Sequence, residues 1–264
     1  MQQLLLVRDR LGVKPLFYAL RGRGLIFGSE LKALLAHPDV SPELDREGLA
    51  EVFVIGPART PGHGVFRGVH ELKPGHLLLY DRNGLRMEPY WTLESRPHED
   101  DFPTTVETVR NLFQDAVQRQ LVSDVPIGTL LSGGLDSSAI TSIAAQVFAQ
   151  ANRSPLPTFS IDYEGNEQHF KGDAFQPDAD GPWAQMVAQR FGTRHRVVRV
   201  STDQLVDALT AAVRARDLPG MADVDASLYL FCRAIKEDVT VAVSGECSDE
   251  LFGGYPWFHR PEAH

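Results

Sequence analysis

The chain has 264 residues, which is long enough for two modest domains, and its 43% hydrophobic and 23% charged residues are typical of an ordinary globular protein. A formal net charge of −9 gives no basic field for nucleic acid, and no apolar run approaches the roughly 20 residues that span a bilayer. With two cysteines and no basic, apolar signal-like run at the N-terminus, we expect a cytoplasmic protein without a disulfide framework or a four-cysteine zinc site.

Residues 1–93 are predicted to form a small domain of antiparallel strands. Short apolar or alternating runs are separated there by glycine, proline and asparagine, a pattern typical of strands joined by turns. The expected strands are residues 4–7, 16–20, 25–27, 76–81 and 85–87, and the expected helices are residues 30–36 and 45–53. Residues 94–103 contain proline and acidic residues with few apolar ones, so we interpret them as a linker.

From residue 104 the pattern changes to alternating helices and strands. Apolar residues recur at helical spacing between residues 106 and 121, which predicts a long helix with one apolar face. Strands are then expected at residues 127–131, 156–163, 195–200 and 239–243, and helices at residues 136–150, 183–191, 202–215 and 226–236. This alternation indicates a parallel sheet with crossover helices. Residues 164–182 are polar and aperiodic, so we expect a long mobile loop there.

The run LSGGLDSS, residues 131–138, lies between a predicted strand and a predicted helix. Gly133 and Gly134 permit a tight turn, and the free N–H groups and dipole of the helix start attract an anion. Further hydroxyl donors come from Ser132, Ser137 and Ser138. Asp136 would repel a phosphate unless a divalent cation lay between them, so we interpret it as a magnesium ligand. The alternative is a simple turn with a helix cap; the lysine of a Walker P-loop is absent from this motif.

A second run, SGECSDELFGGY, follows the predicted strand at residues 239–243. Ligand sites in open α/β sheets form beyond the carboxyl ends of the strands, so two such strand ends are expected to meet around one ligand. The second run contributes the carboxylates of Glu246, Asp249 and Glu250. Together with Asp136 they could hold a metal triphosphate, whereas a solvated acidic loop is the alternative.

The pair LLSGGLDSS and VAVSGECSDELFGGYPWF resembles the synthetase domain of the glutamine-dependent asparagine synthetases. The stretches RDRLGVKPLFY, FGSELKALLAH and ELKPGHLLLY resemble the second half of the N-terminal glutaminase domain of that family. SDVPIGTLLSGG and the pair Tyr90 and Trp91 match the run from one domain into the other. The resemblance covers nearly the whole chain, in the order of the family.

This resemblance implies a two-domain chain of the α/β and α+β classes. Residues 1–93 would be the mostly antiparallel remnant of an N-terminal-nucleophile glutaminase domain, without its N-terminal catalytic part. After the linker at residues 94–103, residues 104–264 would be part of the ATP-binding domain of an asparagine synthetase. The implied fold of this second part is a parallel-sheet PP-loop ATP pyrophosphatase, similar to the adenine nucleotide α-hydrolases.

The resemblance also implies a reaction, in which ATP activates a carboxylate as an acyl-adenylate and ammonia then displaces AMP to form the amide, after release of pyrophosphate. The implied ATP-binding residues are Leu130, Ser132, Gly133, Gly134, Asp136, Ser137, Ser138, Ile161, Ser244 and Gly245. Asp136 and Asp249 would bind Mg²⁺, and Glu246 would accept the proton that ammonia loses. Leu130 and Ile161, expected at strand ends, are equally explained as core residues, and we expect Cys247 to be a packed, inert thiol.

The departures from the family concern both termini. The glutaminase nucleophile of the family is a cysteine at the mature N-terminus, in a segment that precedes the part resembling this chain. Neither Cys232 nor Cys247 can replace it, because both lie in the synthetase half. The family's helical remainder, which supplies a lysine to the adenylation site, would follow residue 264. We therefore expect a fragment, a decayed copy, or a split enzyme completed by a complementing polypeptide or a homo-oligomer.

Three functions remain open from the sequence. Amidation of aspartate with glutamine-derived ammonia ranks first, because RDRLGVKPLFY and SELKAL match the asparagine-making branch. Relatives that share the nucleotide motifs cyclise β-lactam precursors, close peptide rings or amidate cell-wall diaminopimelate, so another carboxylate ranks second. A catalytically silent nucleotide-binding or assembly subunit ranks third. The presence of Asp136, Glu246 and Asp249 argues against a catalytically silent subunit, and the absent termini argue for one.

Overall fold

The computed structural model describes residues 3–172 and 178–259, and the chain divides into two compact units. Unit 1 comprises residues Met1–His98 and Leu209–Asp225, and unit 2 comprises Glu99–Ala208 and Ala226–His264. In the described part of the chain, no helix is long and apolar enough to cross a membrane.

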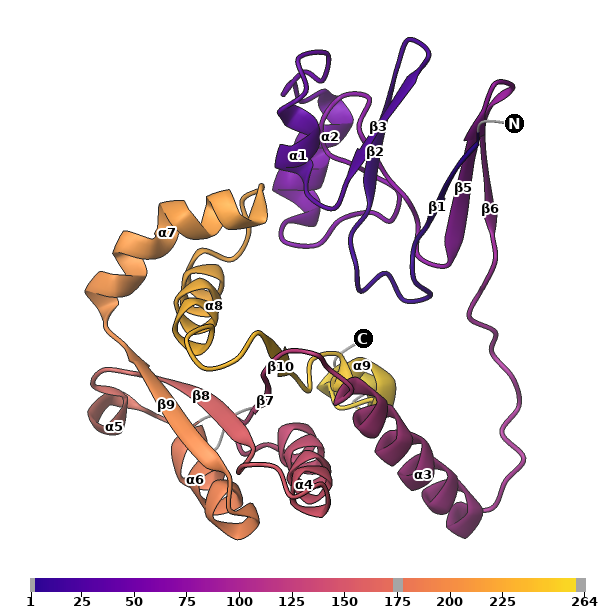
Figure 1. Ribbon diagram of the computed structural model, residues 1–264. Helices are drawn as coiled ribbons and strands as arrows, with labels where there is room; N and C mark the ends of the chain where they lie inside the picture. The colour runs from indigo at the N-terminus through magenta and orange to yellow at the C-terminus, as the bar shows by residue number, and fades with distance from the viewer. Residues whose placement is uncertain (1–2, 173–177, 260–264) are drawn as a thin grey trace. The chain divides into compact units, whose positions relative to one another are not determined.

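Unit 1 contains two antiparallel sheets, as the sequence predicts (Figure 1). One has the order β1-β5-β6, formed by Leu4–Val7, His76–Asp81 and Gly84–Pro89. The other has the order β3-β2-β4, formed by Gly24–Gly28, Phe17–Arg21 and His70–Glu71. The sequence did not predict β4, because two residues are too few to show an alternation. The helices are α1 (Leu31–Leu35), α2 (Arg46–Ala50) and the π-helical turn η1 (Glu51–Ile55).

A buried ion pair holds the loop that follows β1. The guanidinium group of Arg8 lies 3.1 Å from Oε1 of Glu71, and both side chains are less than a tenth exposed. Arg8 also donates to the carbonyl oxygens of Leu72 (2.6 Å), Gly12 (3.1 Å) and Lys14 (3.1 Å). Because buried charges are tolerated only when they are paired and hydrogen-bonded, this network accounts for the start of the RDRLGVKP run in structural terms.

Unit 2 is built on a parallel sheet with the order β10-β7-β8-β9, which confirms the predicted sheet type. Its strands are β7 (Ile127–Leu130), β8 (Pro157–Tyr163), β9 (Arg194–Val200) and β10 (Val241–Val243). The chain steps from β7 to β8 and β9 in one direction, then returns to add β10 on the other side of β7. The sheet therefore has a topological switch point between β7 and β10, where ligand crevices form in open α/β sheets.

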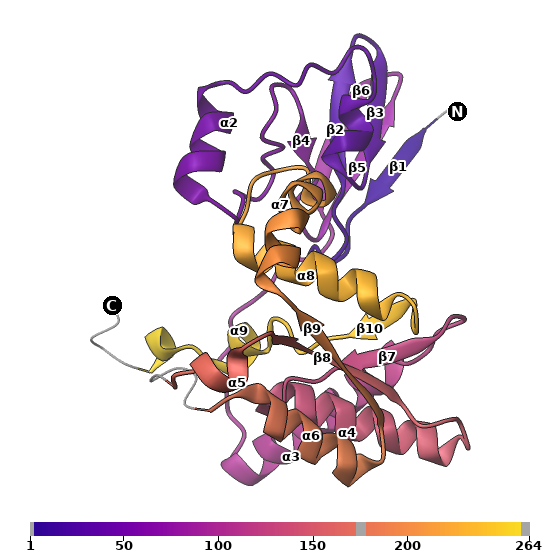
Figure 2. The same cartoon turned by 90° about the vertical axis from the view of Figure 1, so that its left-hand side faces the viewer.

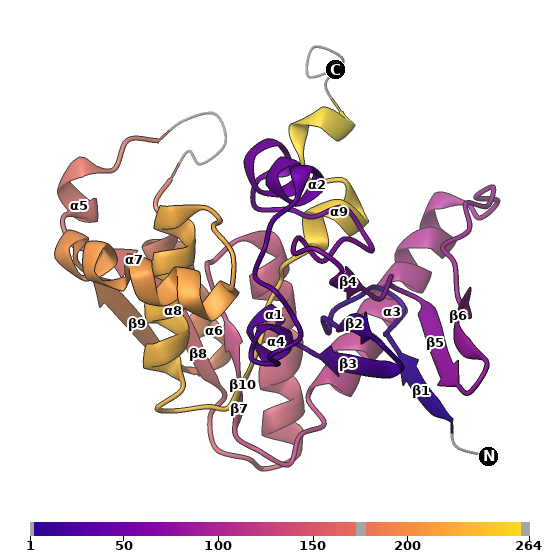
Figure 3. The same ribbon diagram turned by 90° about the horizontal axis from the view of Figure 1, so that it is seen from above.

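Helices cover both faces of this sheet. The views in Figure 1, Figure 2 and Figure 3 place α4 (Leu135–Gln150) and α6 (Asp180–Phe191) on one face and α8 (Ala222–Ile235) on the other. The buried side chains Ile127 and Leu156 pack with Ile140, Ala144 and Phe148 of α4 in one apolar cluster. The remaining helices are α3 (Phe102–Gln120), α5 (Asn166–His169), α7 (Thr202–Arg216), α9 (Ser248–Phe252) and the 3₁₀ turn η2 (Pro256–Phe258).

Two predicted boundaries are wrong. Helix α3 begins at Phe102, inside the expected linker, because Asp101 caps it: the Thr104 N–H donates to Asp101 Oδ1 at 2.9 Å, and a proline fits the first turn. The expected loop at residues 164–182 contains α5 and the start of α6. Residues 173–177 of that loop lie outside the described residues.

Candidate functional site

The loop after β7 is braced by its own hydroxyl groups. Leu130 ends β7, and the N–H of buried Leu131 donates to the Phe159 carbonyl of β8 at 2.8 Å. Ser132 Oγ lies 3.0 Å from Ser137 Oγ and accepts from the Gly134 N–H at 3.3 Å. These contacts fix the turn between the strand and the first residues of α4.

Gly133 is the point at which α6 supports this loop. Its φ of +90° lies in the region that favours glycine. A Cβ atom there would lie 2.5 Å from the Ala184 backbone nitrogen and 2.5 Å from the Trp183 Cβ. The loop therefore packs directly on the backbone of α6, and no side chain fits between them. No local pattern indicates this role for Trp183, which lies 50 residues further along the chain.

The start of α4 has the properties of an anion site. Within residues 3–172 and 178–259, no side chain caps this 16-residue helix at Gly134, so its first N–H groups are left for a ligand. Ser138 Oγ in its first turn is buried and, among the described side chains, has no hydrogen-bond partner. A buried hydroxyl without a partner is costly unless a ligand satisfies it, which fits a bound phosphate group.

The loops after β7 and β10 touch. Val243 of β10 pairs with Thr129 of β7, so both strands end at the same edge of the sheet. Beyond β10, a Cβ atom on Gly245 would lie 3.2 Å from the Asp136 Cβ and 3.4 Å from the Ser137 nitrogen. The structure thus brings Gly245 against the first turn of α4, and the sequence prediction that these two strand ends meet is confirmed.

The acidic loop turns sharply after Gly245. The Glu246 N–H donates to Ser244 Oγ at 3.2 Å, and the Ser248 N–H donates to the Gly245 carbonyl at 3.2 Å. Cys247 between them has a φ of +70° and is exposed, so the expectation of a packed thiol is wrong. The left-handed turn points this side chain outward rather than into the core.

The carboxylates of this loop gather around Tyr255. Its hydroxyl donates to Glu250 Oε1 at 3.3 Å. Removal from water raises the pKa of Tyr255, and the nearby carboxylates of Glu250, Asp249 and Glu246 raise it further, because they disfavour a phenolate. A side chain at Gly254 would overlap the Asp249 carboxylate, so this glycine makes room for it. Both Glu246 and Asp249 are exposed.

The donor set suits a metal ion that arrives with a triphosphate. No group of three or more His, Cys, Asp or Glu side chains in the described residues is arranged to hold a metal ion by itself. Mg²⁺ usually takes only one or two carboxylates and completes its shell with phosphate oxygens and water. Asp136 in the first turn of α4 and Asp249 in the first turn of α9, which follow the two loops at this edge, fit that requirement.

The two expected adenine contacts differ in position. Leu130 is the last residue of β7, as expected, and is half-buried. Ile161 pairs with Val198 of β9 and lies two residues before the end of β8, so its expected place at the strand end is wrong. Tyr163 ends β8 instead.

Comparison with known proteins gives the family. Residues 108–264, more than half of the chain, match the family described as asparagine synthase, and residues 1–91 match a glutamine amidotransferase domain. The chain belongs to the asparagine synthase family. The resemblance inferred from the motifs is therefore confirmed. All of the predicted site residues lie within the segment that matches the asparagine synthase family.

Several curated members of the family are similar over nearly the whole chain. Asparagine synthetase [glutamine-hydrolyzing] 3 of Bacillus subtilis (strain 168) is 57% identical over 259 residues, which cover 98% of this chain and 42% of that protein. Putative asparagine synthetase [glutamine-hydrolyzing] 2 of Methanocaldococcus jannaschii is 29% identical, over 94% of this chain and 46% of that protein. Asparagine synthetase [glutamine-hydrolyzing] 1 of B. subtilis is 31% identical, over 96% of this chain and 38% of that protein. The chain thus spans less than half the length of these relatives.

Proposed function

We propose that the chain carries the ATP-binding part of an enzyme that amidates a carboxylate through an acyl-adenylate, converting aspartate to asparagine with ammonia from glutamine. The parallel sheet is assigned the PP-loop ATP pyrophosphatase fold, within a domain at residues 104–264 that follows a partial amidotransferase domain at residues 1–93. The observation that carries the proposal is the contact of Gly245 with the first turn of α4, at the switch point of the sheet. The amidotransferase match and the curated relatives support the choice of substrates.

The pyrophosphate part of ATP is assigned to the start of α4. There the free N–H groups, the hydroxyl groups of Ser132 and Ser137, and the unpartnered Ser138 Oγ offer donors to phosphate oxygens. Asp136 and Asp249 would hold Mg²⁺, which when bound neutralises phosphate charge. Because two touching loops hold these groups, they are positioned before the substrate arrives, which is what an adenylyl transfer requires of a protein.

The reaction then has two displacements. A carboxylate oxygen of the substrate attacks the α-phosphorus of ATP, and the bond to pyrophosphate breaks. Ammonia attacks the acyl carbon of the adenylate, the bond to AMP breaks, and one proton leaves the nitrogen. Glu246 is the candidate base for this proton, since it is an exposed carboxylate next to Gly245. Ser244 and Gly245 contact the nucleotide, and Leu130 and Ile161 meet the adenine ring.

The test is a calorimetric titration of ATP at several Mg²⁺ concentrations. The unmodified chain should bind ATP more tightly as Mg²⁺ rises. Asp136→Asn should weaken the Mg²⁺-dependent part by about 10- to 100-fold, the worth of one charged hydrogen-bonding group. Asp115→Asn, an exposed aspartate of α3 paired with Arg119, is the matched control and should leave the titration unchanged. If Asp136→Asn and Asp115→Asn behave alike, the metal assignment is wrong.

The substrate is tested by exchange of labelled pyrophosphate into ATP. In the enzyme of which this chain forms the ATP-binding part, aspartate should support this exchange, because formation of its adenylate is reversible, whereas glutamate and diaminopimelate should not. Exchange with one of those two carboxylates and not with aspartate would assign the enzyme to another carboxylate.

A further inference from the structure

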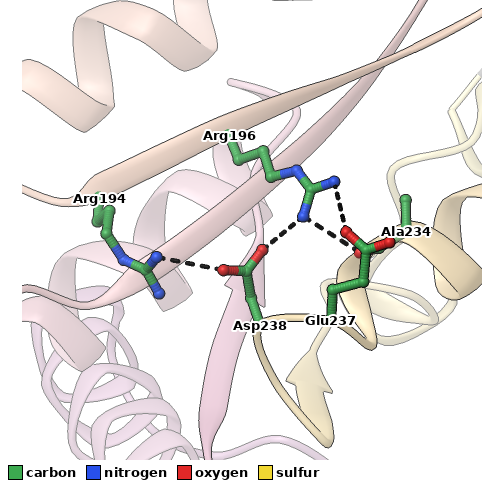
Figure 4. A network of polar contacts seen from close by, with 5 residues as sticks. All are labelled: Arg194, Arg196, Ala234, Glu237 and Asp238. Carbon is green, nitrogen blue, oxygen red and sulfur yellow. Dashed lines mark hydrogen bonds and ion pairs between the residues drawn. The ribbon is translucent and has the colours of Figure 1, made fainter.

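Helix α8 is fastened to β9 at the end that leads into β10. Arg196 of β9 donates to the Ala234 carbonyl at 3.2 Å and contacts Asp238 Oδ2 at 2.6 Å and Glu237 Oε2 at 3.1 Å (Figure 4). Arg194 contacts the other oxygen of the Asp238 carboxylate at 3.2 Å. The last carbonyls of a helix lack partners within the helix, so a guanidinium group that bonds one of them and two following carboxylates is a strong anchor for the helix end.

Two further contacts limit the movement of this part of the chain. In the first half of α8, the hydroxyls of Ser227 and of Tyr163 on β8 lie 2.6 Å apart. Between α8 and β10, the N–H groups of Thr240 and Val241 both donate to the Pro126 carbonyl, at 2.9 and 3.2 Å. The chain is therefore held to β8, β9 and the segment before β7 immediately before it forms β10.

Strand β10 depends on such anchors because it is short. It has three residues and, among the described strands, pairs only with β7 at the edge of the sheet. A slip of one residue would move the following loop by roughly 3.3 Å and turn each side chain to the opposite face. A Cβ atom on Gly245 in that loop would lie only 3.2 Å from the Asp136 Cβ, which is tighter than an ordinary contact, so no slip of that size is compatible with the site.

We propose that Arg196 and Asp238 form a clamp, at the amino edge of the sheet, that sets the register of β10 and so positions Ser244 and Gly245 against the start of α4. Arg196 is thereby a positioning residue that never touches the ligand. Its consequence for ATP binding rests on the proposed function, whereas its consequence for β10 does not.

A typical surface ion pair would not have this effect, because exposed pairs contribute little to stability. The side chain of Asp238 is 21% exposed and binds two arginines, and Arg196 also satisfies a backbone carbonyl. Arg199, on the same strand, makes a matched comparison. Among the described residues its ion-pair partner is the 78% exposed Glu167, so its removal leaves α8 and β10 untouched.

The exposed thiol of Cys247 offers a reporter just beyond the positioned loop. In a full-length Cys232→Ser background, Cys247 is labelled with a trifluoromethyl thiol reagent and its ¹⁹F resonance is recorded. Arg196→Gln should shift or split this resonance, and it should speed hydrogen exchange of the β10 amides by about tenfold, since an unclamped edge strand opens more often. Arg199→Gln should change neither signal. Arg196→Lys, which keeps the charge but loses the planar fork, should lie between the two.

ATP binding is measured on the unlabelled chain. Arg196→Gln should weaken it by roughly three- to tenfold, while Arg199→Gln leaves it unchanged. If Arg196→Gln fails to fold, Asp238→Asn removes the same ion pair more gently and should give the same ¹⁹F and exchange changes. A chain that binds no ATP even when unmodified contradicts the proposed function, and the ¹⁹F and exchange results still decide the clamp. The clamp alone would be overturned if folded Arg196→Gln, or Asp238→Asn in its place, gave the same ¹⁹F spectrum and the same exchange rates as Arg199→Gln.

Discussion

Replacing Gly133 with alanine should lower the free energy of unfolding of unit 2 by a large amount. The backbone at this position has a φ of +90°, and a side chain held in such a region costs about 1–3 kcal/mol. The added Cβ would also lie 2.5 Å from the Ala184 nitrogen and 2.7 Å from the Trp183 carbonyl carbon, and overpacking of this kind costs about 1–3 kcal/mol. The sum is about 2–6 kcal/mol. We expect a loss in the upper half of this range, about 4–6 kcal/mol, because the backbone atoms of a helix cannot move aside as a flexible side chain can.

Urea unfolding measures this loss. With Trp91 and Trp257 replaced by phenylalanine, the fluorescence of Trp183 reports on unit 2 beside the substituted loop. For a slope of about 2 kcal/mol/M, a loss of about 4–6 kcal/mol should lower the urea midpoint of Gly133→Ala by about 2–3 M. The control is Gly181→Ala on α6, which places a Cβ in open space and should raise stability by up to about 1 kcal/mol, as alanine does in helices. Equal midpoints for the two variants would show that the loop does not rest on α6.

Three smaller predictions test other parts of the chain. Arg8→Met leaves Glu71 buried without its partner and should cost about 3–5 kcal/mol in a urea titration of unit 1. Asp101→Ala removes the cap of α3 and should cost about 1 kcal/mol, seen as faster hydrogen exchange in the first turn of that helix. The hydrogen bond from Arg196 holds the pKa of Asp238 below its usual value, so this stabilisation is present above the unfolded-state pKa of about 3.9 and is lost as the pH falls through the lower folded-state pKa. Urea titrations between about pH 6 and pH 3 should therefore lose stability less steeply for Asp238→Asn than for the unmodified chain.

Local patterns in the sequence were sufficient to predict most strands and helices, because alternation and helical spacing report which side chains are buried. They failed where the determinant is not local. Leu218 is an example, since it lies between α7 and α8 but packs in the buried cluster of unit 1 with Leu31 and Leu34 of α1. The start of α8 at Ala222, four residues before the predicted helix, was missed for a related reason. Its first turn is rich in aspartate, so the apolar spacing that predicts a helix is not visible there in the sequence.

The two loops of the candidate site could be located from the sequence, but the contacts between them could not be predicted. Glycines, hydroxyls and carboxylates after two predicted strands are enough to identify two loops, and the parallel order of a sheet places their ends together. The contact between Gly245 and Asp136 depends on the register of β10, which no local pattern specifies. The left-handed turn at Cys247, with a φ of +70°, was missed as well. Such a turn costs a side chain about 1–2 kcal/mol and costs glycine little, so a cysteine there gives no local indication of it.

The carboxyl edge of the parallel sheet carries the candidate site, and the amino edge carries the contacts that hold the site in place. The carboxyl edge presents the loops at Ser132 and Ser244, which must keep their spacing if the first turn of α4 is to accept Gly245, where even a Cβ atom would lie 3.2 Å from the Asp136 Cβ. A strand of three residues has too few ladder hydrogen bonds, each contributing about 1 kcal/mol, to fix its own register against thermal opening. The constraint must then come from the chain that enters the strand. In this fold that chain is the end of α8, which Arg196 binds at the opposite edge, so the precision of the site depends on contacts that lie a full strand length away from it.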